Sequence, residues 1–409
     1  MRADRRWLSG LLLSSLFAIV PDLAILPVHA EITLLGTARL EGKQRDHSGL
    51  TEKLNGGIPH NRLGGISAIE YSGKDDEYVL LPDRGPADGA TDYLCRFHRL
   101  KLVVEPGGTP VVTAVLLSTT MLTDEASRNL VGSATAFDAH DQARGLRFDP
   151  EGLRVNRRGS LYLSDEYGPS VYEFSSSGKR TAVLKVPQRF RIAHPAAAPE
   201  DELARNTTGR QPNGGLEGLA ITPDGSRLYG SMQRPLIQDS RPGKEGIKRH
   251  GTNTRIIEFT IARGTTREFL YPLDDSSNGV SEILAVNSHE FLVLERDSRL
   301  GAEAACKKIF KIDLAGATDL SQRDVLPPDG IPADVAAARK SLFLDLLAPR
   351  FRLAGSDFPE KIEGLAFGPT LPDGRRLLIV AIDNDFHADK PILLHAFAVD
   401  RNELPEFGW

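Results

Sequence analysis

Apolar and polar residues alternate along much of this chain in short runs that tight turns separate. Five stretches share one order: a small apolar segment such as LEGLAIT, a turn that is Asp-Gly in two of them, and an apolar run such as SLYLSD. After a loop of variable length comes a third run, such as SVYEFSSSG or RIIEFTIA. Alternation of apolar and polar residues with a period of two residues is typical of a half-buried strand. The dipeptide Asp-Gly is common in hairpin turns because glycine accepts a positive φ. The pattern predicts antiparallel strands.

The five stretches are internal repeats, which start at Gly64, Asp149, Gly214, Gly279 and Lys361. A fourth, less regular strand is expected, with VVTAVLLST, TAVLKVP and REFLYPL as candidates. Units of four short antiparallel strands are typical of propeller blades. We predict an all-β fold, a β-propeller of five four-stranded blades; a sixth blade in the long loops is an open alternative. An α/β fold is disfavoured because no helical periodicity separates successive strands.

The last repeat shows only three clear strands before the C-terminal tail. The run ITLLGTARL, which starts at Ile32, is a candidate for the missing one. We expect this N-terminal strand to complete the last blade and to close the ring. Within the long loop 317–360, the segment 335–347 has helical character.

The first thirty residues have the features of a secretory signal. Arg2, Arg5 and Arg6 form a basic region, the apolar run 8–20 is short for a membrane span, and Val28-His29-Ala30 suits signal peptidase. We therefore expect residues 1–30 to be a cleaved signal peptide and 31–409 to be a single propeller domain, exported to the periplasm or outside the cell. A retained membrane anchor is the alternative. No later segment is long and apolar enough to cross a bilayer.

Composition adds little to this interpretation. The net charge of -5 and the lack of a basic run with interleaved aromatic residues argue against a nucleic-acid partner. After signal cleavage no membrane partner is expected, and we expect a monomer. Cys95 and Cys306 are either a disulfide, which an exported protein permits, or two separate thiols.

Acidic residues recur at one place in the repeats. Aligned by their first segments, the repeats put in one column Ser67, Glu151, Glu217, Glu282 and Glu363. The first strand of a propeller blade is innermost, so these side chains should converge near the axis. Converging carboxylates must be protonated, paired with cations or bound to a metal ion, and Ca²⁺ accepts several oxygen ligands in flexible geometry. Alternatively, each Glu accepts backbone hydrogen bonds and only links blades.

A second column ends the second strand of each repeat: Asp83-Arg84, Asp165-Glu166, Gln233-Arg234, Glu295-Arg296 and Asp383-Asn384. A hairpin would return these residues to the face that carries the first column. Carboxylates and guanidinium groups would then surround one mouth. The carboxylates could hold cations, and the guanidinium groups could bind a phosphate or carboxylate.

At these motifs the chain resembles the phytase-like family that is described as having esterase-like activity. The segments that carry the resemblance are GGISAIEY with LLPDRGP, DPEGLRV with LYLSDEYGPSVYEFSSSGK, NGGLEGLAITPDGSRLYGSMQ, and KIEGLAFGP with AIDNDF. It extends from about Gly64 to the C-terminus. The resemblance implies a secreted propeller that hydrolyses phosphate or other esters. No motif reproduces those of the calcium-dependent propeller phytases segment by segment.

Two hypotheses follow. The first is an exported, calcium-assisted hydrolase of small anionic phosphate or carboxylic esters; the second is a non-catalytic propeller that binds a ligand or a protein. The first assigns catalysis to Asp83, Asp165 and Glu217, with Asp83 or Asp165 as general base. It assigns substrate binding to Arg84, Arg234 and Arg296. It assigns Ca²⁺ binding to Glu151, Glu217, Glu282, Glu363, Asp165, Glu166 and Asp383.

Overall fold

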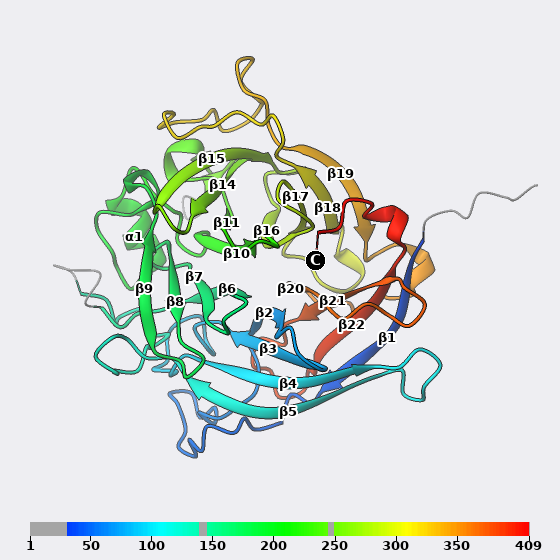
Figure 1. Cartoon of the computed structure of the whole chain (residues 1–409). Helices are drawn as coiled ribbons and strands as arrows, with labels where there is room; N and C mark the ends of the chain where they lie inside the picture. The colour runs from blue at the N-terminus through cyan, green and yellow to red at the C-terminus, as the bar shows by residue number, and fades with distance from the viewer. Residues whose placement is uncertain (1–30, 139–144, 244–248, 409) are drawn as a thin grey trace, which may run out of the picture.

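The computed structural model describes residues 31–138, 145–243 and 249–408. Five four-stranded antiparallel sheets lie around a common centre (Figure 1). This five-bladed propeller confirms the predicted fold class, and a sixth blade is absent from the described residues. The predicted signal peptide, residues 1–30, lies outside them. The described part of the chain holds no helix with the length and apolar character of a membrane span.

The blades follow chain order. The first has β2 (Ile66–Tyr71), β3 (Glu77–Pro82), β4 (Arg96–Val104) and β5 (Val112–Met121), and the second has β6 (Pro150–Val155), β7 (Leu161–Asp165), β8 (Ser170–Phe174) and β9 (Arg180–Lys185). The third has β10 (Leu216–Ile221), β11 (Arg227–Met232), β14 (Asn253–Thr260) and β15 (Thr265–Pro272). The fourth has β16 (Gly279–Ala285), β17 (Glu290–Arg296), β18 (Lys307–Asp313) and β19 (Arg339–Asp345). The fifth has β20 (Ile362–Phe367), β21 (Arg376–Ile382), β22 (Ile392–Val399) and β1 (Ile32–Leu40).

The remaining elements are short and lie between these strands. A small ribbon joins β12 (Arg241–Pro242) to β13 (Arg249–His250). The described helices are α1 (Pro199–Arg205) and the 3-10 turns η2 (Gln188–Phe190), η3 (Ile237–Asp239), η4 (Gly301–Glu303), η5 (Pro349–Phe351) and η6 (Arg401–Glu403). The helical character expected within 335–347 is wrong, because β19 forms there and pairs with β18.

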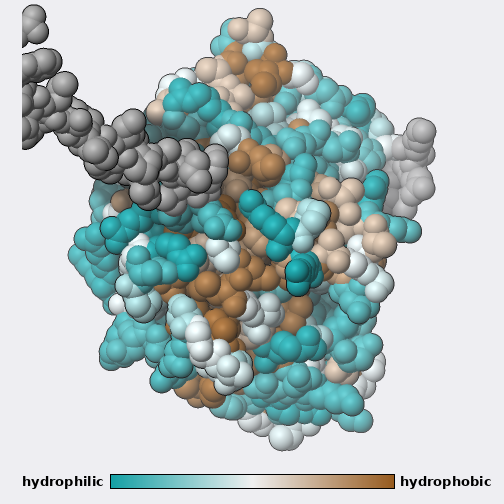
Figure 2. Space-filling model, turned by 90° about the vertical axis from the view of Figure 1, so that its right-hand side faces the viewer, coloured by the Kyte–Doolittle hydropathy of each residue, from teal (hydrophilic) through white to brown (hydrophobic). Residues whose placement is uncertain are grey.

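The strand β1 is the outer strand of the fifth blade, as the sequence predicts. It pairs antiparallel with β22, from Ile32 opposite Val399 to Leu40 opposite Ile392. Its residues Ala38 and Leu40 are buried in one apolar cluster with side chains of both the first and the fifth blade. On the side of the molecule that carries β1, apolar residues form a patch within a largely hydrophilic surface (Figure 2).

The core lies between neighbouring blades rather than in one central mass. Separate buried clusters join the fourth to the fifth blade, the third to the fourth, and the first to the second. The first strands of the blades are nearest the centre, and their neighbours are one another (Figure 1). Cys95 and Cys306 are both free and buried, so they do not form a disulfide in this structure.

Candidate functional site

The inner strands share an irregularity that fixes which residues are equivalent. In each, the pairing with the second strand shifts near the start of the inner strand, as between Leu216 and Leu219 in β10 and between Val280 and Glu282 in β16. The residues at this shift are Ser67, Glu151, Glu217, Ser281 and Glu363. The fourth member of the column is therefore Ser281, and the sequence alignment that put Glu282 there is one residue out of register.

Glu282 instead lies at a position that Gly or Ala occupies in the other blades. Its Oε1 accepts hydrogen bonds from the backbone N–H groups of Leu219 (3.0 Å) and Ile283 (2.9 Å). Its Oε2 is 3.1 Å from the guanidinium of Arg154, which is buried in β6. Burial raises the pKa of Glu282 to about 7. Glu282 thus belongs to a buried network along the channel, away from the carboxylates of its predicted column.

The ends of the second strands supply a second ring at the same mouth. The N–H groups of Asp83, Glu166, Gln233 and Asp383 donate to the residue that precedes the inner strand, and Arg296 pairs there with Gly279. These five residues are equivalent. Asp165 and Glu295 come one residue earlier, and so on a pleated strand their side chains point to the opposite face.

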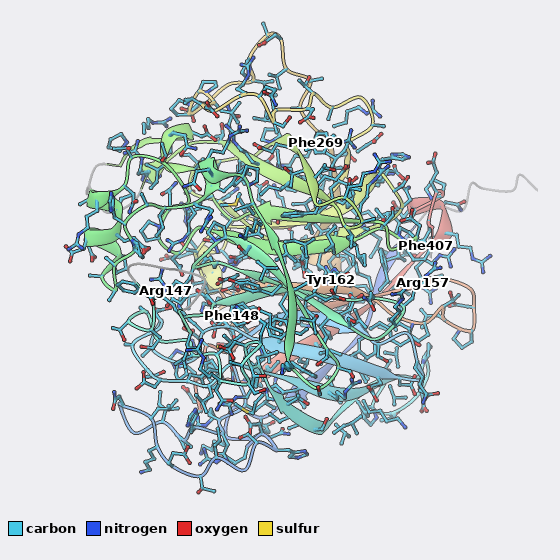
Figure 3. All side chains as sticks on the ribbon, turned by 60° about the vertical axis from the view of Figure 1, so that its left-hand side comes forward. Arg147, Phe148, Arg157, Tyr162, Phe269 and Phe407 are labelled. Carbon is cyan, nitrogen blue, oxygen red and sulfur yellow. The ribbon has the colours of Figure 1, made fainter. Side chains whose placement is uncertain are left out.

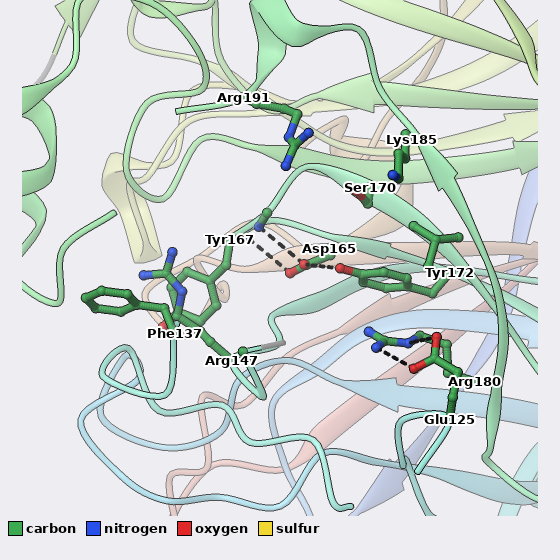
Figure 4. A pocket seen from close by; sticks show the side chains of 13 residues that line it. Glu125, Phe137, Arg147, Asp165, Tyr167, Ser170, Tyr172, Arg180, Lys185 and Arg191 are labelled. Atoms are coloured by element: carbon green, nitrogen blue, oxygen red, sulfur yellow. Dashed lines mark hydrogen bonds and ion pairs between the residues drawn. The ribbon is translucent and has the colours of Figure 1, made fainter. Parts of the chain in front are cut away.

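Asp165 accordingly faces a different pocket (Figure 4). This pocket, of about 260 Å³, is also lined by Arg147, Arg180 and Tyr172. The Asp165 carboxylate accepts a bond from the Tyr172 hydroxyl (3.3 Å) and from three backbone N–H groups, one of them that of Asp149 (3.1 Å). Burial raises its pKa to about 6. In this position Asp165 holds the backbone of Asp149 in place.

A first acidic group lies where the second blade meets the mouth. The carboxylate oxygens of Asp149, Glu151 and Glu166 come within 4.8 Å of one another. Glu151 is partly exposed, whereas Asp149 and Glu166 are buried. Burial and the neighbouring carboxylates raise the pKa of Glu151, and burial together with Asp149 raises that of Glu166 to about 7. Such a group favours a proton or a cation.

Arg84 is the counter-ion of this acidic group. Its guanidinium donates to Asp149, to Glu166 (3.2 Å) and to Asn213, and its side chain is 10% exposed. The backbone N–H of Gly215 also donates to Glu166 (3.1 Å), which links the second blade to the third. Because its donors are used in this way, Arg84 is placed to hold the carboxylates rather than a substrate.

A second acidic group, Asp83, Asp383 and Asp385, lies at the mouth where the first and fifth blades meet. Lys361 neutralises part of its charge: its Nζ is 2.8 Å from Asp385 and 3.5 Å from Asp383. The nearby Asp383 and Asp83 carboxylates raise the pKa of Lys361, although burial opposes this. This group therefore already contains a cation of its own.

Glu217 lies between the acidic and the cationic sides of the mouth. The Gln233 amide donates to its Oε1 (2.7 Å), while its Oε2 is buried and has no hydrogen-bond partner among the described residues. Burial and the carboxylates of Glu166 and Glu363 raise its pKa. The residue is 4% exposed. A buried carboxylate oxygen without a partner is costly unless a ligand supplies one.

Arg234 and Arg296 line a pocket of about 140 Å³ in this mouth, together with Gln233, Ser281 and Lys361. Arg296 donates to Ser281 Oγ (2.9 Å) and to Glu363 Oε1 (2.6 Å). In the described chain the guanidinium of Arg234 has no hydrogen bond or ion pair. Burial and the charge of Arg296 lower its pKa. Two adjacent guanidinium groups, one with all its donors open, favour binding of an anion.

Asp149 and Lys361 also lie at the mouth, although neither was among the site residues predicted from the sequence. Both lie immediately before an inner strand, and the equivalent residues of the other three repeats are Gly65, Gly215 and Gly279. A charged residue in place of glycine in two of five repeats was the available signal.

The fold and its site define a five-bladed β-propeller whose mouth combines clustered carboxylates with the guanidinium groups of Arg234 and Arg296. A model of the phytase-like family, described as "esterase-like activity of phytase", matches residues 61–386. Since this match covers most of the chain, the protein belongs to the phytase-like family.

Individual relatives add less. An uncharacterized secreted protein of Arthroderma benhamiae is 29% identical over 285 residues, which are 55% of this chain and 55% of that protein. Two solved structures are similar over most of this chain. A hydrazine synthase of Kuenenia stuttgartiensis is 9% identical, with a TM-score of 0.35, over 82% of this chain and 76% of that one. A putative 6-phosphogluconolactonase of Bacteroides uniformis is 12% identical, with a TM-score of 0.34, over 80% of each chain. Likeness at this level says nothing about activity.

Proposed function

We propose that this protein is an exported hydrolase that cleaves small anionic phosphate or carboxylic esters at the mouth described above, with Ca²⁺ bound to its acidic side. The observation that carries the proposal is the unpartnered Oε2 of Glu217. This oxygen belongs to the third blade, whose neighbours at the mouth are the acidic group of the second blade and the pocket of Arg234 and Arg296. A carboxylate in this position can accept a proton from a water molecule.

The donor set fits calcium. Asp149, Glu151 and Glu166 offer only carboxylate oxygens, the ligand type that Ca²⁺ prefers, and the partial exposure of Glu151 gives an ion access. When bound there, the ion would supply Lewis-acid polarisation of an ester oxygen.

The protein's own side chains bind the substrate and transfer the proton. Arg234 and Arg296 bind the anionic group and stabilise the charge that develops on it. Glu217 Oε2 takes the proton of the attacking water, whose oxygen forms the new bond to phosphorus or carbon. The ester bond then breaks, and the leaving alkoxide takes that proton from Glu217, which restores the carboxylate and releases the alcohol. Gln233 fixes the Glu217 carboxylate through Oε1 and so directs Oε2 towards the water.

Glu217→Gln tests the proton transfer. With p-nitrophenyl phosphate, p-nitrophenyl acetate and phytate as substrates, this variant should lower kcat about 100-fold or more, because positioned general bases contribute at least that much. Exposed Glu105→Gln serves as the matched control and should leave kcat unchanged. Wild-type activity should disappear when a chelator removes calcium. A folded wild-type protein that hydrolyses none of these esters would favour the non-catalytic binding propeller instead.

Arg234→Gln tests the anion clamp. This variant should raise KM for p-nitrophenyl phosphate by about tenfold or more, because a charge-assisted hydrogen bond contributes about 1.5–3 kcal/mol. KM for the uncharged p-nitrophenyl acetate should change little. Equal losses with both substrates would mean that Arg234 supports the mouth without binding the anionic group.

Export is part of the proposal. It is supported by the basic and apolar pattern of the first thirty residues and by the relative that is described as secreted. N-terminal sequencing of the protein recovered from outside the cytoplasm should begin at Glu31. Recovery of the uncleaved chain in the membrane fraction would favour the anchor.

A further inference from the structure

The channel has a second pocket at its other end. This cavity of about 350 Å³ is lined by residues from the C-terminal ends of β2, β6, β16 and β20, among them Glu70, Val155, Leu284 and Phe367. The mouth described above uses the N-terminal ends of the same strands. Figure 3 shows Arg157 and Phe407, which line the cavity, together at one side of the molecule and Arg147 towards the other.

Aromatic rings form much of the wall and are held in place. Phe367 and Phe407 make an edge-to-face contact with their centroids 4.7 Å apart, and the guanidinium of Arg376 lies 4.3 Å over the Phe407 ring. The next residue, Gly408, donates a backbone hydrogen bond to Val286 (2.9 Å). The C-terminal segment therefore forms a fixed wall in the described structure.

The floor of the cavity is negatively charged. Glu70 lines it and keeps 12% of its side-chain surface exposed. Its only ionic partner in the described chain is Arg154, at 3.2 Å, and Arg154 also pairs with Glu282. One guanidinium cannot neutralise two carboxylates, and burial raises the pKa of Glu70 to about 7. The network therefore gains from one further positive charge, which a proton or a ligand can supply.

Among the described residues that line the cavity, Arg157 alone is positively charged; it is exposed and donates to the carbonyl oxygen of Pro223 (2.7 Å). Water and salt screen an exposed charge far more strongly than a buried one. Arg157 therefore offsets the negative charge of Glu70 only weakly.

We propose that this cavity binds a small organic cation, an ammonium group on one apolar or aromatic body, with the ammonium against Glu70. The apolar body fits the wall of Phe367, Leu284 and Phe407, and aromatic faces attract cations. The volume is that of a small-molecule site. This site is separate from the proposed hydrolytic mouth and does not depend on it.

A charge series on one aromatic frame tests the site in the full-length protein. Calorimetric titration with 2-phenylethylamine, 2-phenylethanol and 3-phenylpropionate at neutral pH should give the tightest binding for the amine. The amine should exceed the alcohol by about tenfold or more, the amount that one charge-assisted hydrogen bond supplies. Equal binding of amine and alcohol, tighter binding of the carboxylate, or no binding at millimolar concentration would each overturn the proposal.

Two variants locate the binding. Glu70→Gln should remove the preference for the amine over the alcohol, and Phe407→Ala should weaken both ligands. Glu105→Gln, at an exposed turn, should change neither. Both cavity variants should keep wild-type ester hydrolysis at the opposite mouth, so failure of one proposal is distinguishable from failure of the other. An amine preference that survives in folded Glu70→Gln would overturn the assignment to this floor.

Discussion

Arg154 is a single buried guanidinium that two carboxyl groups share. It lies 3.2 Å from Glu70 and 3.1 Å from Glu282, and both acids are buried within the channel. Replacing either acid removes a charge from a site that holds more negative than positive groups. Such a change should therefore be tolerated better than loss of Arg154, which would leave both carboxylates without a cationic partner.

The pH dependence of folding should report this network. Burial raises the pKa of Glu282 from 4.5 to about 7. A carboxyl group with a raised pKa stabilises the fold fully below its unfolded pKa, and that contribution is lost as the pH rises through the folded one. Between pH 4.5 and 7 the wild type should therefore lose stability relative to Glu282→Gln, by at most about 3 kcal/mol.

Urea denaturation at a series of pH values measures this difference. The exposed Glu105→Gln should follow the wild-type pH curve. Parallel curves for the wild type and Glu282→Gln would contradict the raised pKa.

At the same scale, sequence analysis identified most of the charged residues at the mouth but not their contacts. The column of Glu151, Glu217 and Glu363 was visible because each is followed by Gly. The fourth repeat reads Ser-Glu where three of the others read Glu-Gly, and this moved Glu282 one position out of register. Gln233 donates a hydrogen bond to one carboxylate oxygen of Glu217 and leaves the other without a hydrogen-bond partner. The spacing of residues in the sequence cannot predict which oxygen this is.

At the scale of the element, the glycine after the shifted residue sets how closely inner strands approach. A Cβ on Gly218 would lie 2.6 Å from the backbone nitrogen of Ile283 and 2.7 Å from the Cα of Glu282. These are backbone atoms of β16, so they cannot move aside without moving the strand. Gly152 and Gly364 approach the next blade in the same way.

Gly218→Ala should therefore destabilise the fold by about 1–3 kcal/mol, the usual cost of an extra methyl group in a packed core. Thermal or urea unfolding measures it. Gly279→Ala is the matched control: its Cβ would meet the flexible Gln233 side chain at 3.2 Å, and its cost should be smaller. Equal losses in the two variants would contradict the role of close strand approach.

Strands were predicted correctly where apolar and polar residues alternate regularly, and wrongly where the local composition favours a helix. The turns and paired runs of the first three strands in each repeat match the sheets. The segment before β19 is rich in alanine, which favours helix locally. Pairing with β18 makes the β19 residues a strand instead of a helix. The paired residues are about thirty positions apart in the sequence, from Asp313 opposite Arg339 to Lys308 opposite Asp345.

At the scale of the whole molecule, bound calcium should stabilise the folded state. A ligand that binds only the native state at about 100 times its Kd adds about 2.7 kcal/mol. Saturating Ca²⁺ should therefore raise Tm, and Glu151→Gln should abolish that rise while raising the Tm of the calcium-free protein by relieving repulsion.

Asp385→Asn is the control, because Lys361 already neutralises part of the second acidic group. Its Tm should still rise with Ca²⁺. The reverse pattern, with the rise kept in Glu151→Gln and lost in Asp385→Asn, would place the ion at the second acidic group.

The pairing of β1 with β22 has a consequence for how the chain is made. Thr37 bonds to His395, 358 positions away. The ribosome synthesises β1 early and β22 near the end. For most of synthesis β1 therefore has an unpaired, apolar edge, which could pair with another nascent chain. Contacts this distant in sequence also form slowly. A holdase that covers this edge until β22 arrives should raise the yield of native protein.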